Sequence, residues 1–203
     1  MTRMQGVPQD RSPLVRFVYR MARREMKRMT GKPLMTPDVP VRAHNLPLLM
    51  SYARFEKGVA AKTRVPESLR ALAVLKSAVM QGCEMCQDIG SFEARANGIS
   101  DEQQRELYRY RESEHFDERE RLVLDLAVGM TLTPVQVGEG LIAALREHFD
   151  ERQMVELVNL IAVENLRSRF NAAFALGPAG FSEGMVCARM EPAQAKAHAV
   201  VAA

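Results

Sequence analysis

The chain has 203 residues and a formal net charge of +3, and 47% of its residues are hydrophobic. This length suits one domain with a short extension, and no stretch approaches the ~20 uncharged residues that a membrane-spanning helix needs. The N-terminus lacks the apolar segment of a signal peptide, and three cysteines do not make the disulfide framework of a secreted protein. We therefore expect a cytoplasmic protein.

Basic residues are concentrated near the N-terminus. After a lead over residues 1–11 that we expect to be disordered, Ser12 and Pro13 are typical of a helix cap and a first helical position. The predicted helix ends near residue 29, before Gly31. The segment 11–32 has one acid and eight bases: Arg11, Arg16, Arg20, Arg23, Arg24, Lys27, Arg28 and Lys32. The predicted buried face consists of apolar residues at helical spacing: Leu14, Phe17, Val18 and Met21.

A basic amphipathic helix can bind an anionic membrane or nucleic acid. The alternative is a helix that is docked on its own protein or on another subunit, with its bases in solvent. We predict the docked helix and do not expect contact with nucleic acid or a membrane.

Two helices are predicted in the next part of the chain. Prolines make residues 32–47 an extended, irregular connection, and helices follow over about 48–59 and 66–81. Apolar residues cover more than half of the second helix, which should be deeply buried. The expected buried side of the first helix consists of Leu48, Leu49, Tyr52 and Phe55.

Capping signals divide the remainder into further helices. Gly82 ends the buried helix, and a helix that begins at the cysteines runs to about residue 97. Capping boxes at residues 100–103, 133–136 and 150–153 each predict a helix start. The last helix, over about 151–176, has a predicted buried stripe of Met154, Leu157, Val158, Ile161, Leu166, Phe170 and Phe174. Beyond residue 180 we expect a loose tail. No strand alternation appears, so the predicted fold is an all-α helical bundle.

The motif Cys83-Glu84-Met85-Cys86 has several possible interpretations. A thioredoxin-like site needs strand–helix–strand context, which is absent. Half a zinc site needs two more ligands, for which the chain offers only Cys187 and four scattered histidines: His44, His115, His148 and His198. A redox dithiol on a helical scaffold needs nothing further, and two merely structural cysteines remain the other alternative. We expect the redox dithiol, with no metal and no bound cofactor.

The residues around this motif resemble the carboxymuconolactone decarboxylase-like family, which includes alkylhydroperoxidase D. The shared features are a buried helix ending in Gln81-Gly82, the Cys pair, an acidic residue two positions later, and a helix closed by Gly98-Ile99-Ser100. Segments 145–150, 154–161 and 169–171 also look like this family. The resemblance covers residues 45–182, which leaves residues 1–44 as a basic helical arm with its Pro-rich connection and residues 183–203 as a tail.

The resemblance implies an all-α fold, a homo-oligomer that is a trimer or a multiple of it, and reduction of small hydroperoxides. Cys86 would attack the peroxide, and Cys83 would resolve the sulfenic acid into a disulfide. An external thiol would then reduce that disulfide.

Two positions depart from the peroxidase members of the family. They carry a Glu twelve residues before the first cysteine and a His four residues after the second, where this chain has Ala71 and Gly90. That Glu and His form a proton relay. Acidic residues next to the cysteines, Glu84 and Asp88, would in addition disfavour a thiolate.

The chain has other residues that could act on the thiols in place of this relay. Lys76, on the buried helix, is a possible auxiliary residue that would favour thiolate formation, although a lysine there more often extends to solvent or pairs with an acid. His115 and His148 are interpreted as surface residues, and Cys187 receives no role. Glu164 and residues 167–169 are interpreted as a salt-bridge set.

The sequence therefore predicts a thiol-dependent oxidoreductase. The alternative is a family scaffold without peroxidase activity that acts as a redox-sensing or binding module, which the residues at positions 71 and 90 favour. A lactone decarboxylase ranks last, because no basic pocket for substrate carboxylates can be placed near the cysteines.

Overall fold

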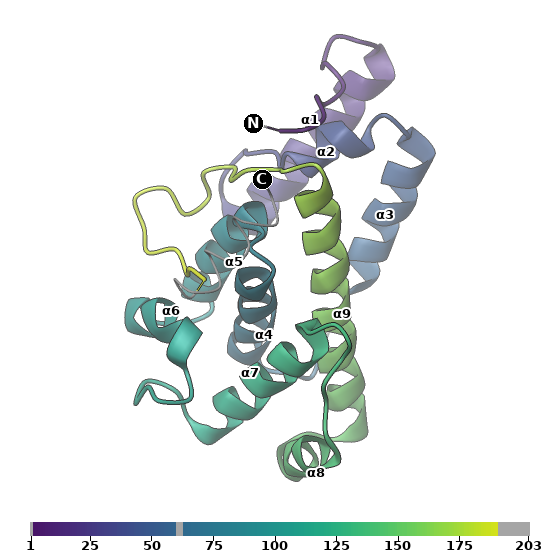
Figure 1. Ribbon diagram of the computed structural model, residues 1–203. Helices are drawn as coiled ribbons and strands as arrows, with labels where there is room; N and C mark the ends of the chain where they lie inside the picture. Colours follow the sequence, from purple (N-terminus) through teal and green to yellow (C-terminus); the bar gives the residue numbers. More distant parts are fainter. Residues whose placement is uncertain (1, 60–62, 191–203) are drawn as a thin grey trace.

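A computed structural model describes residues 2–59 and 63–190, and over these residues the chain is all-α, without strands (Figure 1). This confirms the predicted fold class. The elements are α1 (Pro13–Thr30), α2 (Asp38–Arg42), α3 (Leu46–Val59), α4 (Glu67–Met80), α5 (Glu84–Ala96), α6 (Asp101–Glu106), the short 3-10 helix η1 (Leu107–Arg109), α7 (Glu118–Thr131), α8 (Glu139–His148) and α9 (Glu151–Ala173).

Helix α4 lies at the centre and packs against α5, α7 and α9. Leu72, Ala73, Leu75 and Ala78 have no exposed surface, which confirms the predicted deep burial of this helix. On one side α4 shares a hydrophobic cluster with α7, α8 and α9, and on another it packs with α5, α7 and the segment around Tyr110. Truncating one of its leucines would cost about 2–5 kcal/mol of stability.

Two of the three predicted capping boxes are formed. Ser100 with Gln103 begins α6, and Asp150 with Gln153 begins α9. The third prediction, at residues 133–136, is wrong, because the following helix begins only at Glu139. Residues 132–137 instead turn back along α7, where the Gln136 N–H donates to the Gly129 carbonyl at 2.9 Å. A Cβ atom at position 129 would lie 2.3 Å from the Gln136 carbonyl oxygen, so this close return depends on glycine.

The N-terminal helix has the predicted ends but a different buried face. Ser12 caps α1 and Gly31 ends it with a positive φ. The side chains that pack inward are Val15 and Tyr19, in a cluster with Val7, and the Tyr19 hydroxyl donates to the Val7 carbonyl at 2.6 Å. The predicted face is wrong in its main members, because the following side chains of α1 are exposed: Leu14, Phe17 and Met21.

The arm lies on the body of the molecule (Figure 1). Residues 2–11, which were expected to be disordered, include the buried Val7, and the Arg3 N–H donates to the carbonyl of Phe174 at the end of α9 at 2.9 Å. The connection 32–47 also contains one helical turn and a half, α2, in which Arg42 pairs with Asp38. In α3 Leu49 is buried, whereas Leu48 and Phe55 of the predicted face are exposed.

After α9 the chain crosses α5, as the yellow trace in Figure 1 shows. Phe181 and Ala188 are fully buried, so the described part of the predicted loose tail is packed on the body. The rest of that tail, 191–203, lies outside the described residues.

Asp88 on α5 holds this crossing segment. Its carboxylate accepts hydrogen bonds from the backbone N–H groups of Ala179, Gly180, Phe181 and Ser182 and from the Ser182 hydroxyl, at 2.6–3.0 Å. Burial alone would raise the pKa of Asp88, but the Ser182 hydroxyl and these N–H groups outweigh it, and the pKa lies below its usual range. The charge therefore anchors the C-terminal segment.

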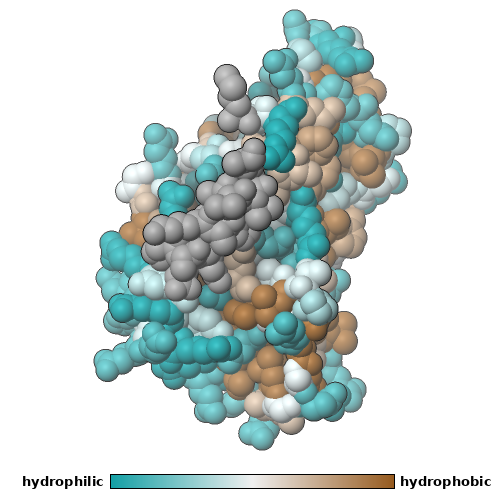
Figure 2. Space-filling model, viewed as in Figure 1, coloured by the Kyte–Doolittle hydropathy of each residue, from teal (hydrophilic) through white to brown (hydrophobic). Residues whose placement is uncertain are grey.

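Apolar side chains gather on the lower part of the face shown in Figure 2, in the region of α7, α8 and α9. A shallow groove between α9 and the turn after α7 is lined there by Leu132, Val135 and Leu166, all of which are exposed.

Within the described residues, none of the helices has the length and apolar character needed to cross a membrane.

We expect Asp88→Asn to cost about 2–3 kcal/mol of unfolding free energy at pH 7, because several buried donors lose a charged acceptor. A group whose pKa is lowered in the folded state stabilises the protein above its unfolded pKa and loses this effect as the pH falls. The difference between the wild type and the variant should therefore shrink below about pH 4. Urea unfolding at several pH values measures it, with Glu84→Gln, an exposed acid on the same helix, as the control. A pH-independent difference would contradict the anchoring role of the charge.

Candidate active site at the Cys83–Cys86 pair

The two cysteines lie where α4 ends and α5 begins. Gly82, with φ of 63°, lets the chain turn out of α4, and Cys83 then occupies the N-cap position of α5. Its sulfur accepts a hydrogen bond from the Cys86 N–H at 3.3 Å. Cys83 and Cys86 form a disulfide, with their Cα atoms 5.2 Å apart. The unpaired N–H groups and positive end of a helix favour a thiolate at this position once the bond is reduced.

The disulfide is covered by both terminal parts of the chain. Cys83 is 2% and Cys86 7% exposed. They share a hydrophobic cluster with Val41 of α2 and Leu176 after α9, against which Met4 also packs. The predicted arm is therefore part of the site's enclosure.

Arg42 fixes α2 over the site by aromatic contacts. Its guanidinium carbon lies 3.8 Å from the ring centroid of Tyr52 and 3.6 Å from that of Phe170. Contacts of a cation with two aromatic faces are favourable and are strengthened by burial. They join the arm to α3 and α9 beside the cysteines.

Polar side chains of α9 contact the two sulfurs. The Asn171 amide nitrogen lies 3.3 Å from the Cys86 sulfur and 3.6 Å from the Cys83 sulfur. The Ser168 hydroxyl oxygen lies 3.5 Å from the Cys86 sulfur and 3.0 Å from the Glu164 carboxylate. All three polar residues of α9 are buried. Hydrogen-bond donors around a sulfur favour its anionic form.

The Asn171 amide also presents its oxygen to this enclosed space. That oxygen is buried and has no hydrogen-bond partner among the described residues. A buried acceptor without a donor is costly, and at a functional site it marks a position for a donor. A cysteine S–H in the reduced protein or the O–H of a substrate would satisfy it.

Glu164 belongs to a buried ionic cluster. Arg167 donates to the Glu164 carboxylate at 3.2 Å and to both carboxylate oxygens of Glu56 on α3. Burial raises the pKa of Glu164 to about 7, against the opposing effects of Arg167 and the Ser168 hydroxyl, and the charge of Glu93 adds to the increase. The predicted salt-bridge set is thus present for Glu164 and Arg167, while Arg169 donates to the hydroxyl of Thr133.

The two positions that differ from the peroxidase members, 71 and 90, pack against neighbouring apolar side chains. Ala71 packs against an apolar cluster. Gly90 lies against α4, where an added Cβ would be 3.2 Å from the Leu75 side chain. An imidazole at position 90 would therefore require Leu75 to move.

The auxiliary residue predicted from the sequence has other contacts. The buried Lys76 ammonium donates to the Leu107 carbonyl at 3.0 Å and lies 4.7 Å from the ring centroid of Tyr110. His115 is exposed, and the Cys187 sulfur accepts from the Ser91 hydroxyl at 3.6 Å. Among the described residues, no group of three or more His, Cys, Asp or Glu side chains is arranged to hold a metal ion.

Ser168 and Asn171 are site residues that the sequence does not predict, and Glu164 is predicted only as part of a salt-bridge set. A signal for all three exists, because they follow Leu157 and Ile161 at spacings of three and four residues along the buried face of α9. Polar residues at these positions lie on the buried face of the helix. Buried polar side chains of this kind indicate a functional site.

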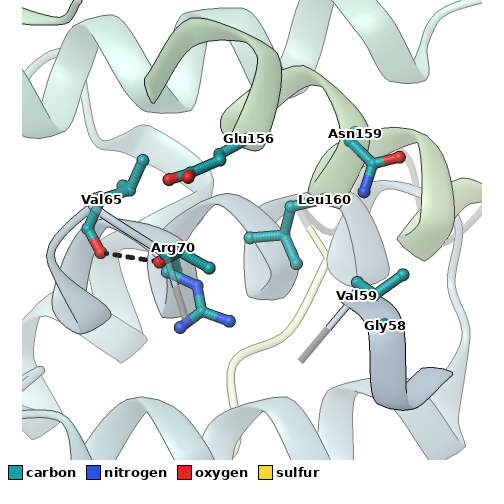
Figure 3. Close-up of a pocket in the computed structure, with 8 residues that line it drawn as sticks. Gly58, Val59, Val65, Arg70, Glu156, Asn159 and Leu160 are labelled. Carbon is teal, nitrogen blue, oxygen red and sulfur yellow. Dashed lines mark hydrogen bonds between the residues drawn. The ribbon is translucent and has the colours of Figure 1, made fainter. Parts of the chain in front are cut away.

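A separate cavity lies at the other end of α4 (Figure 3). Its lining comes from the end of α3, the start of α4 and the first half of α9, and includes Val59, Arg70, Glu156 and Asn159. Helix α4 has 14 residues, which corresponds to a length of about 20 Å. The cavity is therefore not part of the cysteine site.

Comparisons with known proteins agree with the fold and the motif. Residues 48–129, a region that includes the Cys pair, match the model of the Carboxymuconolactone decarboxylase family, and the predicted resemblance is confirmed. The uncharacterized protein YnjA of Escherichia coli (strain K12) is 35% identical over 105 residues, which are 52% of this chain and 58% of YnjA. YdfG of Bacillus subtilis (strain 168) is 28% identical over 62% of this chain and 84% of its own. The chain therefore aligns with little more than half the length of YnjA.

Several solved structures have a similar fold over most of the chain. The debrominase Bmp8 in complex with 2,3,4-tribromopyrrole has a TM-score of 0.72 at 17% identity, over 99% of this chain and 98% of its own. A peroxidase-related protein of Silicibacter sp. TM1040 has a TM-score of 0.76 at 19% identity, over 91% and 95%. An alkylhydroperoxidase AhpD core protein of Ralstonia eutropha JMP134 has a TM-score of 0.73 at 17% identity, over 87% and 92%. At these identities the likeness establishes the fold.

We expect Val41→Ala to increase the rate at which dithiothreitol reduces the disulfide several-fold, because Val41 covers the sulfurs. Val15→Ala is the matched control, since Val15 is equally buried within the arm but packs away from the cysteines. Each truncation costs about 2 kcal/mol of packing. Counting free thiols against time gives the two rates, and equal rates would show that Val41 does not limit access.

Proposed function

We propose that this protein is a thiol-dependent oxidoreductase that reduces small organic hydroperoxides through a dithiol–disulfide cycle of Cys83 and Cys86. The observation that carries the proposal is the disulfide at the N-terminus of α5, with the Cys86 N–H and the Asn171 amide directed at its sulfurs. Donors and a helix N-terminus favour the thiolate that this chemistry needs. The alkylhydroperoxidase-type fold supports the same class of reaction.

The cycle consists of two balanced steps. The Cys86 thiolate attacks the outer oxygen of the hydroperoxide, the O–O bond breaks, and the products are a Cys86 sulfenic acid and an alkoxide that takes up a proton to become an alcohol. The Cys83 thiol then attacks the Cys86 sulfur, which releases water and forms the disulfide. Two thiols are oxidised for each hydroperoxide reduced.

Reduction of the disulfide needs an external dithiol. Its thiolate would attack the sulfur of Cys86, the more exposed residue of the pair, and Cys83 would leave as a thiolate at the N-cap of α5. A supply of such thiols is a property of the cytoplasm, which agrees with the expected location.

Self-association is part of the same proposal. Exposed apolar residues on α9 and on the turn after α7, together with those of α1, offer surfaces for further copies of this chain. The family resemblance favours a trimer or a multiple of it. Contact of the basic arm with nucleic acid or a membrane is not part of this proposal.

A second candidate is a redox-sensing module without peroxidase turnover. The burial of both sulfurs and the replacement of the family's proton relay at positions 71 and 90 favour it. Such a module would exchange its disulfide with a partner thiol and react slowly with peroxide.

The two candidates differ in the reaction of the reduced protein with one equivalent of cumene hydroperoxide. We expect rapid loss of two thiols and a Cys83–Cys86 disulfide in mass-spectrometric peptide maps. Cys86→Ser should prevent this reaction, whereas Cys187→Ser should leave it unchanged. Thiols that persist for hours would contradict the peroxidase and favour the redox-sensing module.

A further inference from the structure

The Ser168 hydroxyl is the link between a thiol and a carboxylate inside the protein. Its oxygen lies 3.5 Å from the Cys86 sulfur and 3.0 Å from the Glu164 Oε1 atom. Ser168 has no exposed surface, and Glu164 is 2% exposed. A hydroxyl between two groups that both bind protons can accept from one while it donates to the other.

We propose that Glu164 exchanges a proton with Cys86 through the Ser168 hydroxyl, and that this pair on α9 replaces the relay whose positions hold Ala71 and Gly90. The inference rests on the proposed function, because it assigns the proton transfers of the same thiol. In this scheme Ser168 is the catalytic residue that touches the reacting sulfur, and Glu164 acts through it.

The single proton of the hydroxyl gives the relay its two states. When Glu164 is ionised, the Ser168 O–H donates to the carboxylate, and its oxygen is free to accept the S–H of Cys86. When Glu164 holds the proton, the carboxylic acid donates to the Ser168 oxygen, and the O–H then points at the Cys86 sulfur. A concerted shift of two protons interconverts these states and forms the thiolate without water.

The surroundings keep Glu164 able to change its protonation. Arg167 on the same helix donates to it, Glu56 of α3 shares that arginine, and Glu93 of α5 adds a like charge. Arg70 of α4 acts in turn on Glu93, whose pKa burial raises. The pKa of Glu164 is raised to about 7 by burial, so that both forms are populated in the physiological range.

The same pair can serve both halves of the peroxide reaction. Glu164 first takes the thiol proton by way of Ser168, which leaves the Cys86 thiolate to attack the hydroperoxide. As the O–O bond breaks, the proton returns by the same route to the leaving alkoxide, and the alcohol departs. No proton has to enter the closed site from solvent during this step.

The test isolates Cys86 as the one cysteine by means of Cys83→Ser and Cys187→Ser, and follows its alkylation by iodoacetamide from pH 5 to 10. With Glu164 present, the rate should rise in two steps, the first near pH 7 as Glu164 loses its proton. Glu164→Gln and Ser168→Ala should each abolish the first step and lower the rate at pH 7.5 by about 10²-fold.

A purely electrostatic role of Glu164 predicts the opposite sign. Removing a nearby negative charge would favour the thiolate and make alkylation at pH 7.5 faster. Glu93→Gln is the matched control for loss of a nearby, half-buried acid, and it should retain the first step at a lower pH, since the Glu93 charge raises the pKa of Glu164. Faster alkylation in Glu164→Gln, or a retained first step in both relay variants, would overturn the proposal.

The hydroperoxide reaction separates failure of the relay from failure of the proposed function. In the protein with both Cys83 and Cys86, the relay predicts that the rate of thiol loss with cumene hydroperoxide falls in Ser168→Ala in parallel with alkylation. If the wild-type thiols do not react with peroxide, the proposed peroxidase function is contradicted, but the alkylation experiment still tests the relay. If the wild type reacts with peroxide and Ser168→Ala reacts at the same rate, the relay is contradicted but the proposed peroxidase function is not. Circular dichroism verifies that each variant folds. If Glu164→Gln does not fold, the result for Ser168→Ala alone decides whether the relay exists.

Discussion

Helix α4 is enclosed by other helices on almost all sides, and this enclosure determines where everything else can lie. Its fully buried leucines and alanines leave room for close neighbours only, and at Gly90 the backbone of α5 approaches the Leu75 side chain to within contact distance. The chain leaves α4 through Gly82 and enters α5 at once, so the first residues of α5 are held against the end of α4. Because α9 packs on the same helix, its buried face also reaches the cysteines.

Electrostatic effects at the site follow from how each acid is solvated. Asp88 is two residues from Cys86, yet its carboxylate is directed at the C-terminal segment and is surrounded by N–H donors. A carboxylate that stays ionised but is surrounded by N–H donors has a weaker effect on a thiolate than its sequence position suggests. Glu164 is far from the cysteines in sequence, but it accepts from Arg167 and from the Ser168 hydroxyl, and this hydroxyl also contacts the Cys86 sulfur. The packing of α9 on α5 therefore determines which acid acts on the Cys86 sulfur.

Much of the fold follows from local signals that act within a few residues. Caps such as Ser12 and Ser100, and the apolar coverage of α4, depend on neighbours along the chain and are correctly predicted from it. The buried face of α1 was mispredicted because two apolar stripes compete on that helix, and the choice between them depends on Val7 and the cluster around Leu49. The apparent capping box at residues 133–136 failed for a similar reason, since a tertiary contact with Gly129 decides that turn.

The candidate site also contains one part that the local sequence predicts and one part that depends on tertiary packing. The Cys pair is a sequence motif, whereas Ser168 and Asn171 reach it from residues more than eighty positions later. Nothing close to the cysteines in sequence indicates these partners. Only the register of α9 relative to α5, which depends on the packing of the whole bundle, aligns them with the sulfurs.

The contact of Arg3 with Phe174, and the packing of Met4 and Val41 with Leu176, have a consequence for the synthesis of the protein. The ribosome makes the N-terminal arm first, but its docking surface is completed only when the end of α9 has emerged. Contacts of such high sequence separation form late, after α4 and α5 can already pack together. The two thiols therefore lack this enclosure from the time they are made until the end of α9 has followed, and the enclosure that later limits access to them forms late.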